Sequence, residues 1–286
     1  SDERLAWEKA SVAEMKEKFD PAKLDPESRT SFDMWALQAE MDEKLAAFRR
    51  QGYVFVKDGP HSSLANFLIT FHEVSEKSDM DAYIKRLGEV ARALDQSVEQ
   101  AKLAADAGVR PPRFAYDQAS QESTNVITGA PFGAGADSPL WADVKSKIKV
   151  LVDGGKLTAD EAKAMEAAAK AVLVDTVQPS YERIIAYLKT DRSNAAEQSQ
   201  GVSSFKDGAA FYNAMLEAQT TTKMTADEIH ELGLKEVARL RSEMEAIREK
   251  VGFKGDLTAF LAFMRTDNQF YEPSTDAGRA AYLKKA

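Results

Sequence analysis

The chain has 286 residues, of which 44% are hydrophobic and 29% charged, so it is long enough to bury one large core or two smaller ones. Its 38 basic and 46 acidic residues give a net charge of −8, and because this field opposes contact with a polyanion we expect no nucleic-acid partner. The absence of cysteine excludes disulfides, thiolate nucleophiles and cysteine metal sites, and it is compatible with the cytoplasm or the periplasm.

The N-terminal third is dominated by helical periodicity. A helix is predicted from Asp2 to Phe19, where Asp20-Pro21 disfavours its continuation. Further helices are predicted over Ser31–Arg50, Leu64–His72 and Ser78–Ala107. Tyr53–Val56 is rich in β-formers but too short and isolated to build a sheet, so we interpret it as an extended connector.

The middle of the chain contains the clearest predicted loop, Ile127–Pro139, which is rich in glycine and alanine. It could be a mobile cover or a crossing between helices, and it is the one place where we expect a possible internal boundary. Helices are predicted on either side of it, over Phe114–Glu122 and Trp141–Val152. The next helix is predicted from a capping box at Thr158 and Glu161 as far as Leu188, with a kink or break near Val177 caused by Pro179.

The stretch from Phe211 to Tyr271 has the most consistent helix signals. Thr225 and Glu228 form a second capping box, and Gly252 ends the helix that they begin. Apolar residues then recur along one helical stripe, which we expect to face a core; its members are Ile229, Val237, Leu240, Met244, Ile247 and Val251.

These elements predict an all-α protein, a multi-helix array of long and short antiparallel helices with at most one short extended segment. We expect residues 1–286 to form a single helical unit. No run approaches the roughly 18 apolar residues of a membrane-spanning helix, so no transmembrane segment is predicted.

The histidines do not match the zinc-peptidase pattern, which needs a second histidine four residues after the first. Leu234 stands at that place after His230, and Glu76 stands there after His72. The second pair could ligate a metal in principle, but ordinary packing or solvation is the simpler interpretation of both histidines, and His61 offers less still.

The remaining polar motifs favour structural roles. The glycine runs at 133–135 and 154–158 lack phosphate-loop spacing, and no serine stands in a nucleophile elbow. Acidic residues at 160–161, 227–228 and 231 fall in the opening turns of helices, where they complement the helix dipole. Residues 121–125, with the sequence QESTN, could line a substrate cleft. The sequence therefore assigns no catalytic or metal-binding residue, and the substrate-binding residues stay unknown.

A resemblance to a known family rests on segments spread over most of the chain from about Ser31 onward. They are Leu64–Leu87, the GVRPP string at Gly108–Pro112, and TTTKMTADEIHELGLKEVARLRSEMEAI followed by VGFKGDLTAFLAFMRTDNQFY. In these segments the chain resembles the bacterial domain-of-unknown-function family 885.

The resemblance implies a part in peptide hydrolysis. Members of this family resemble zinc metallopeptidases and carry an HExxH motif on a later helix, and they are often exported or lipid-anchored. The resemblance therefore implies that this chain is the non-catalytic N-terminal part of a zinc-dependent peptidase and forms one wall of the substrate cleft. Its partner would be a C-terminal half that follows Ala286 and holds the zinc, and the complete protein would bind a peptide substrate.

Two alternatives stay open at this point. The chain could instead be a helical binding or scaffold protein without hydrolytic activity, so the sequence leaves enzyme status undecided. The resemblance favours the periplasm, whereas the composition is compatible with either compartment. We also expect Phe260 and Phe263, in the predicted helix Leu257–Met264, to belong to an apolar edge that the C-terminal half would cover.

Overall fold

The computed structural model describes residues 2–285, and over these residues the protein is all-α, as predicted. No β-strand forms within them; an isolated bridge between Ala130 and Asp137 is their one extended pairing. Tyr53–Val56 lies outside the helices, in the connection between α2 and α3.

The α-helices follow one another along the whole described chain. They are α1 (Asp2–Lys18), α2 (Pro26–Ala46), α3 (Pro60–Phe71), α4 (Lys77–Asp106), α5 (Arg113–Val126), α6 (Pro139–Asp153), α7 (Ala159–Val172), α8 (Gln178–Asp191), α9 (Gly208–Thr220), α10 (Ala226–Lys250), α11 (Leu257–Thr266) and α12 (Asp276–Lys285). Short 3₁₀ turns lie between some of them, and a π-helical segment, η2 (Leu173–Val177), joins α7 to α8.

The chain divides into two compact units, Ser1–Met215 and Leu216–Ala286. The division falls inside α9, whereas the loop at 127–139 lies within the first unit.

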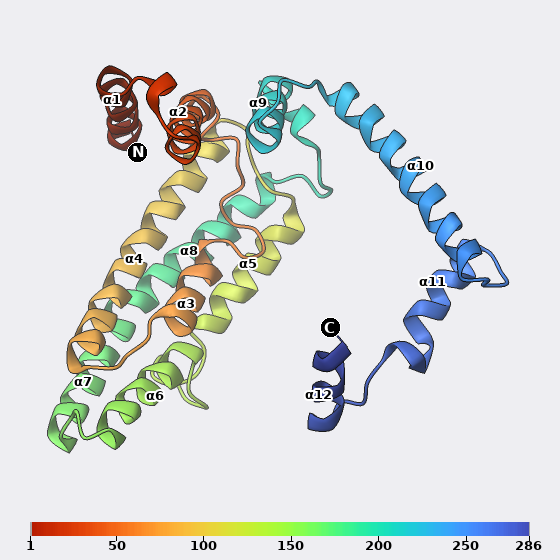
Figure 1. Ribbon diagram of the computed structural model, residues 1–286. Helices are drawn as coiled ribbons and strands as arrows, with labels where there is room; N and C mark the ends of the chain where they lie inside the picture. The colour runs from red at the N-terminus through yellow and green to blue at the C-terminus, as the bar shows by residue number, and fades with distance from the viewer. Residues whose placement is uncertain (1, 286) are drawn as a thin grey trace. The chain divides into compact units, whose positions relative to one another are not determined.

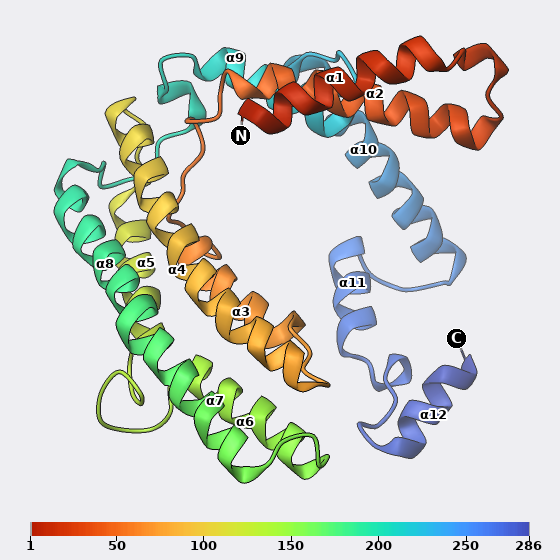
Figure 2. The same cartoon turned by 90° about the vertical axis from the view of Figure 1, so that its left-hand side faces the viewer.

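The core of the first unit lies among its longest helices. Figures 1 and 2 show α4, α5 and α8 running side by side, with α3 against α4 and α5, and with α6 and α7 paired at one end. One continuous cluster of buried apolar side chains fills the space between these helices. Its large, fully buried members include Tyr83, Leu87, Leu94, Ile148, Leu173, Tyr181 and Ile184. In the same unit α1 and α2 form a hairpin, in which Trp7 and Trp35 meet edge to face at 5.7 Å.

Helix ends follow the predicted capping chemistry at two places. Both capping boxes form, with the amide of Glu161 donating to Thr158 Oγ1 at 3.3 Å and the amide of Glu228 donating to Thr225 Oγ1 at 3.2 Å. These bonds satisfy amides that the first helical turn leaves without an intrahelical partner.

The interruption predicted at Pro179 is a π-helical turn within a continuous helical run. Proline cannot donate to the carbonyl four residues earlier, and its ring crowds that position. The chain accommodates this in the wider turn of η2, where the amide of Gln178 bonds to the carbonyl of Leu173 five residues back.

The loop between α5 and α6 is closed by its own backbone. The amide of Ala130 donates to Ala136 O at 2.9 Å, and the amide of Ser138 donates to Ala130 O at 2.8 Å. Gly129 has φ +87°, and a Cβ there would lie 2.2 Å from Ala136 O, so only glycine fits. Phe132 packs against the core. Of the two interpretations left open, this geometry agrees with a crossing between helices.

The second unit has little buried surface. No residue of α10 is buried, although we predicted that its apolar stripe faces a core; that prediction is wrong for this unit taken by itself. Instead, the buried apolar side chains Leu257 and Phe260 belong to α11. Phe253 packs against Phe260 and Phe263 with ring centroids 5.2 and 5.1 Å away.

Candidate functional site

A groove of about 810 Å³ runs between α4 and α8 in the first unit. It extends along α4 from Gly88 to Lys102 and along the other wall from Thr176, in the π-helical segment, to Thr190. This volume lies within the roughly 300–1,000 Å³ of typical ligand pockets. We therefore consider the groove the candidate binding site.

Small residues open the groove. Gly88 and Ala91 on α4, and Ala186 on α8, stand where larger side chains would fill the space between the helices. A Cβ at Gly88 would have no atom within 4 Å. The amphipathic pattern of each helix does not specify this gap, because it depends on which faces of α4 and α8 meet.

The rim of the groove is charged, and its charges are paired. Arg183 on α8 makes two hydrogen bonds to the Asp95 carboxylate on α4, at 2.8 and 2.7 Å, and this carboxylate raises the pKa of Arg183. Arg92 and Lys102 pair with glutamates on α4 itself. Each charged side chain that lines the groove therefore has a partner of opposite sign.

Tyr187 connects the groove to a buried polar cluster. Its ring lines the groove and packs near Phe55 with centroids 6.1 Å apart. Its hydroxyl approaches Asp191 Oδ2 at 3.5 Å. Burial, together with the Asp191 charge, raises the pKa of Tyr187 to about 12, so the phenol is neutral at physiological pH.

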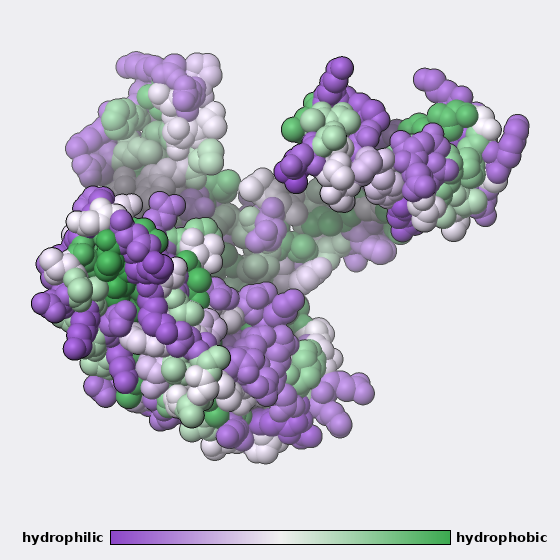
Figure 3. All heavy atoms as spheres, turned by 90° about the horizontal axis from the view of Figure 1, so that it is seen from below, coloured by the Kyte–Doolittle hydropathy of each residue, from purple (hydrophilic) through white to green (hydrophobic). Residues whose placement is uncertain are grey.

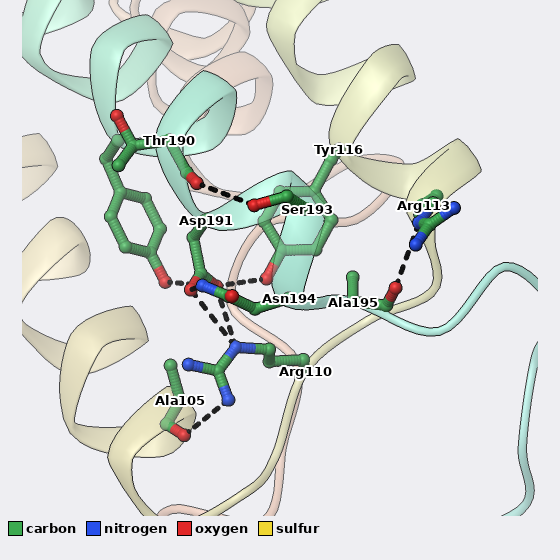
Figure 4. A network of polar contacts seen from close by, with 10 residues as sticks. Ala105, Arg110, Arg113, Tyr116, Thr190, Asp191, Ser193, Asn194 and Ala195 are labelled. Carbon is green, nitrogen blue, oxygen red and sulfur yellow. Dashed lines mark hydrogen bonds and ion pairs between the residues drawn. The ribbon is translucent and has the colours of Figure 1, made fainter.

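Asp191 is the centre of that cluster (Figure 4). The buried carboxylate accepts hydrogen bonds from the Tyr116 hydroxyl at 2.6 Å, from Asn194 Nδ2 at 3.1 Å and from Arg110 Nε at 3.1 Å. Burial alone would raise its pKa, but these three donors outweigh burial and hold the pKa of Asp191 below its usual value.

The cluster ties distant segments together. Arg110 also donates to Ala105 O at 2.8 Å, at the end of α4, and Asp191 is the last residue of α8. Nearby, Arg113 donates to Ala195 O at 3.0 Å. The donors to Asp191 come from the start of α5 and from the segments that follow α4 and α8, so Asp191 ties the ends of these three helices together.

His72 has both ring nitrogens occupied. Arg86 Nη1 lies 2.8 Å from Nδ1, and Nε2 lies 3.0 Å from the carbonyl oxygen of Asp79. Since guanidinium only donates and a carbonyl only accepts, Nδ1 carries the lone pair and Nε2 carries the proton. The Nδ1 lone pair, with which the ring would bind a metal, already accepts the hydrogen bond from Arg86.

Glu76 is occupied as well. It is the N-cap residue of α4, where it forms a capping box with Asp79, and it makes an ion pair with Lys156. His72 and Glu76 therefore stabilise the start of α4, and the pair does not form a metal site in this arrangement.

His61 is a core residue tied to the QESTN segment. Its Nε2 lies 2.8 Å from Glu122 Oε2, and its carbonyl oxygen accepts from the buried Tyr181 hydroxyl at 2.7 Å. Thus Glu122 faces a histidine of α3 and not the groove between α4 and α8. Ser123, beside it, is fully buried in α5.

The other candidate residues are not brought together. His230 lies on the exposed surface of α10, and acidic residues follow it on the same helix. The acidic residues at 160–161 and 227–228 lie in first turns, as predicted, and the glycine run at 154–155 ends α6.

Two negative findings apply to residues 2–285. They contain no group of three or more His, Cys, Asp or Glu side chains placed to hold a metal ion. None of their helices combines the length and apolar character that crossing a membrane requires.

The comparisons with known proteins give a family and one similar fold. The family model described as "Bacterial protein of unknown function (DUF885)" matches residues 1–286. A solved structure, "the putative lipoprotein from Colwellia psychrerythraea", is similar with a TM-score of 0.68 and 19% sequence identity. The match covers 82% of this chain and 39% of that chain, so this chain corresponds to well under half of the solved one. A search of curated proteins found no match.

Proposed function

Starting from the finding that the chain belongs to the DUF885 family of bacterial proteins, we propose that it is the non-catalytic helical part of a zinc-dependent peptidase. In this proposal the helices of the first unit form one wall of the cleft that binds the peptide substrate. The observation that carries the proposal is the groove between α4 and α8, which has an apolar floor and a charged rim.

The groove has the chemistry that an extended peptide needs. Apolar contacts from Ala91, Val98 and Ala186 suit side chains of a substrate, while the Asp95–Arg183 pair offers both signs of charge. Most ligand sites combine an apolar lining with a few polar groups in this way.

The residues present do not fit a zinc site. The Nδ1 lone pair of His72 accepts a hydrogen bond from Arg86, and His61 and His230 belong to no group of three or more possible metal ligands within residues 2–285. We therefore assign no step through zinc to this chain, and we propose that the metal and its ligands belong to another part of the protein. The match to only 39% of the solved relative supports this division.

We also propose that the protein is exported. The support is the description of the solved relative as a lipoprotein.

The test uses the complete protein encoded by the gene and the 286-residue chain, each incubated with a mixed peptide library that is then analysed by mass spectrometry. We expect cleavage and bound zinc for the complete protein. Ala186→Trp, which fills the groove from an exposed position on α8, should lower kcat/KM at least tenfold. Lys189→Trp adds the same side chain outside the groove and should leave kcat/KM unchanged.

Two results would refute the proposal. Peptide binding without cleavage, lost in Ala186→Trp, would identify a helical binding or scaffold protein. Cleavage that is insensitive to Ala186→Trp would show that the groove is not part of the cleft.

A further inference from the structure

A row of exposed apolar side chains runs along α10 in the second unit. We call it the α10 stripe and define it by five residues: Val237, Leu240, Met244, Ile247 and Val251. Their side chains are between 42% and 66% exposed. Removing such side chains from water is favourable, and soluble proteins seldom leave a contiguous row of them exposed.

The apolar residues of α11 do not cover the α10 stripe, because they pack among themselves. Phe253, Phe260, Phe263 and Phe270 form a chain of ring contacts, with centroids 5.1–5.3 Å apart. The predicted exposed edge at Phe260 and Phe263 is thus largely closed within the unit. Figure 3 shows hydrophobic atoms at the surface among hydrophilic ones.

The charged flanks of the stripe are already paired inside the second unit. Arg239 bonds to Glu236 at 2.7 Å and to Glu243 at 2.6 Å. Arg248 bonds to Glu245 at 2.6 Å and to the carbonyl of Gly255 at 2.9 Å, which fixes the turn after α10. A partner therefore gains apolar burial on the stripe without having to supply matching charges.

The spacing of the stripe fits a helix as its partner. The five residues alternate at three and four positions, which is the seam that packs against another helix. One turn earlier, Gly233 has no atom within 4 Å of a built Cβ, so a partner backbone could approach closely there.

We propose that the α10 stripe is the docking surface for an amphipathic helix belonging to the part of the protein outside these 286 residues. The proposal rests on the proposed function in one respect, that this chain is a portion of a longer peptidase-like protein. Its support is the solved relative, of which the matched region is only 39%, together with the length of the exposed seam.

A second copy of the chain fits the stripe less well. The seam covers two heptads, from Val237 to Val251, whereas stable coiled coils sustain about three to four.

Because the chain contains no cysteine, a single introduced thiol can report on the stripe. Leu240→Cys places the thiol on the stripe, and Ser242→Cys places it on the exposed opposite side of α10 as a matched control. Each variant is made in the 286-residue chain and in the complete protein, and the rate of modification by a thiol reagent is measured at several protein concentrations.

We expect both thiols to react rapidly in the 286-residue chain. In the complete protein, Leu240→Cys should react at least tenfold more slowly while Ser242→Cys is unchanged. Slow reaction of Leu240→Cys in the monomeric 286-residue chain would overturn the proposal in favour of the first unit as the cover. If the reaction of Leu240→Cys slows as the protein concentration rises, the proposal is overturned in favour of a second copy. Rapid reaction of Leu240→Cys in the complete protein would overturn it outright, and so would a reading frame that ends at Ala286. None of these rates depends on zinc or peptidase activity, so this proposal and the proposed function can fail separately.

Discussion

The hydroxyl of Tyr116 donates a 2.6 Å hydrogen bond to the carboxylate of Asp191, a residue 75 positions further along the chain. The same carboxylate receives Arg110, so α5, α8 and the turn after α4 meet at one buried charge. Tyr187, in the floor of the groove, lies beside it. The polar cluster therefore lies directly beside the groove, which Tyr187 and Thr190 both line.

Replacing Asp191 should destabilise the first unit more than replacing any one donor. Asp191→Asn leaves Arg110 without its counter-ion, and breaking a buried pair typically costs about 3–5 kcal/mol. Tyr116→Phe removes one bond to a charged acceptor, worth about 1.5–3 kcal/mol. Urea unfolding measures both values. As a control, Asp117→Asn breaks an exposed bidentate pair with Arg192 and should change the free energy of unfolding little; equal losses in Asp117→Asn and Asp191→Asn would contradict this account.

The contribution of Asp191 to the free energy of unfolding should depend on pH. Its folded-state pKa lies below the unfolded value of about 3.9, because its hydrogen-bond donors outweigh the effect of burial. The stabilisation is therefore fully present above that value and is lost as the pH falls through the folded-state pKa. The difference in unfolding free energy between wild type and Asp191→Asn should narrow as the pH falls below about 4. A difference that stays constant down to pH of about 2 would show that the charge of Asp191 is not responsible.

His72 should bind no zinc. Arg86 uses the Nδ1 lone pair and Asp79 O accepts from Nε2, so long-range proton–nitrogen correlation spectra should report the Nε2–H tautomer. Metal analysis of the chelator-washed 286-residue chain after zinc addition should find no stoichiometric metal. One zinc per chain, lost in His72→Ala, would mean that this histidine is a ligand after all.

The fold was predictable because its signals are local. Thr158 with Glu161 and Thr225 with Glu228 are adjacent in sequence, and both form the expected capping boxes. The position of the interruption at Pro179 followed from proline chemistry, although its form as a π-helical turn did not. Helix starts with an aspartate N-cap were harder to predict. The helix α2 begins at Pro26, with Asp25 as its N-cap, whereas we predicted a start at Ser31.

The candidate site was not predictable in the same way. Gly88 and Ala186 are separated by almost a hundred residues, and nothing in either helix shows that the two positions face each other. Arg110 belongs to a segment that carries the family resemblance, but its partner Asp191 stood in a stretch with no motif. The apolar stripe of α10 correctly predicted a helix, but the prediction that the stripe faces a core was wrong. Periodicity shows which face of a helix is apolar and does not show what covers that face.

Two glycines in open space should tolerate alanine. A Cβ at Gly88 or at Gly233 meets no atom within 4 Å, and alanine favours a helix over glycine by about 1 kcal/mol. Gly88→Ala and Gly233→Ala should each raise the free energy of unfolding of the 286-residue chain by about that amount, measured by urea titration followed by circular dichroism.

Gly278→Ala is the matched control, because its Cβ would lie 2.0 Å from the carbonyl oxygen of Pro273. It should destabilise α12. In the complete protein, Gly233→Ala should lose its benefit if a partner helix passes close to that position. A gain in stability from Gly278→Ala would indicate that the close approach of Pro273 is wrong.

The last prediction separates the aromatic contacts of α11 from the α10 stripe. Phe260 is buried against Phe253, so Phe260→Ser should destabilise the second unit by about 3 kcal/mol or more, as large-to-small core changes do. Leu240→Gln changes an exposed position of α10 and should leave the stability of the 286-residue chain nearly unchanged. Binding of a hydrophobic dye should respond in the opposite order: it should fall in Leu240→Gln, because the dye loses part of the stripe, and it should persist in folded Phe260→Ser protein. If Leu240→Gln instead cost several kcal/mol in the isolated chain, the stripe would already be buried there, and the helix that covers it would have to be sought within these 286 residues.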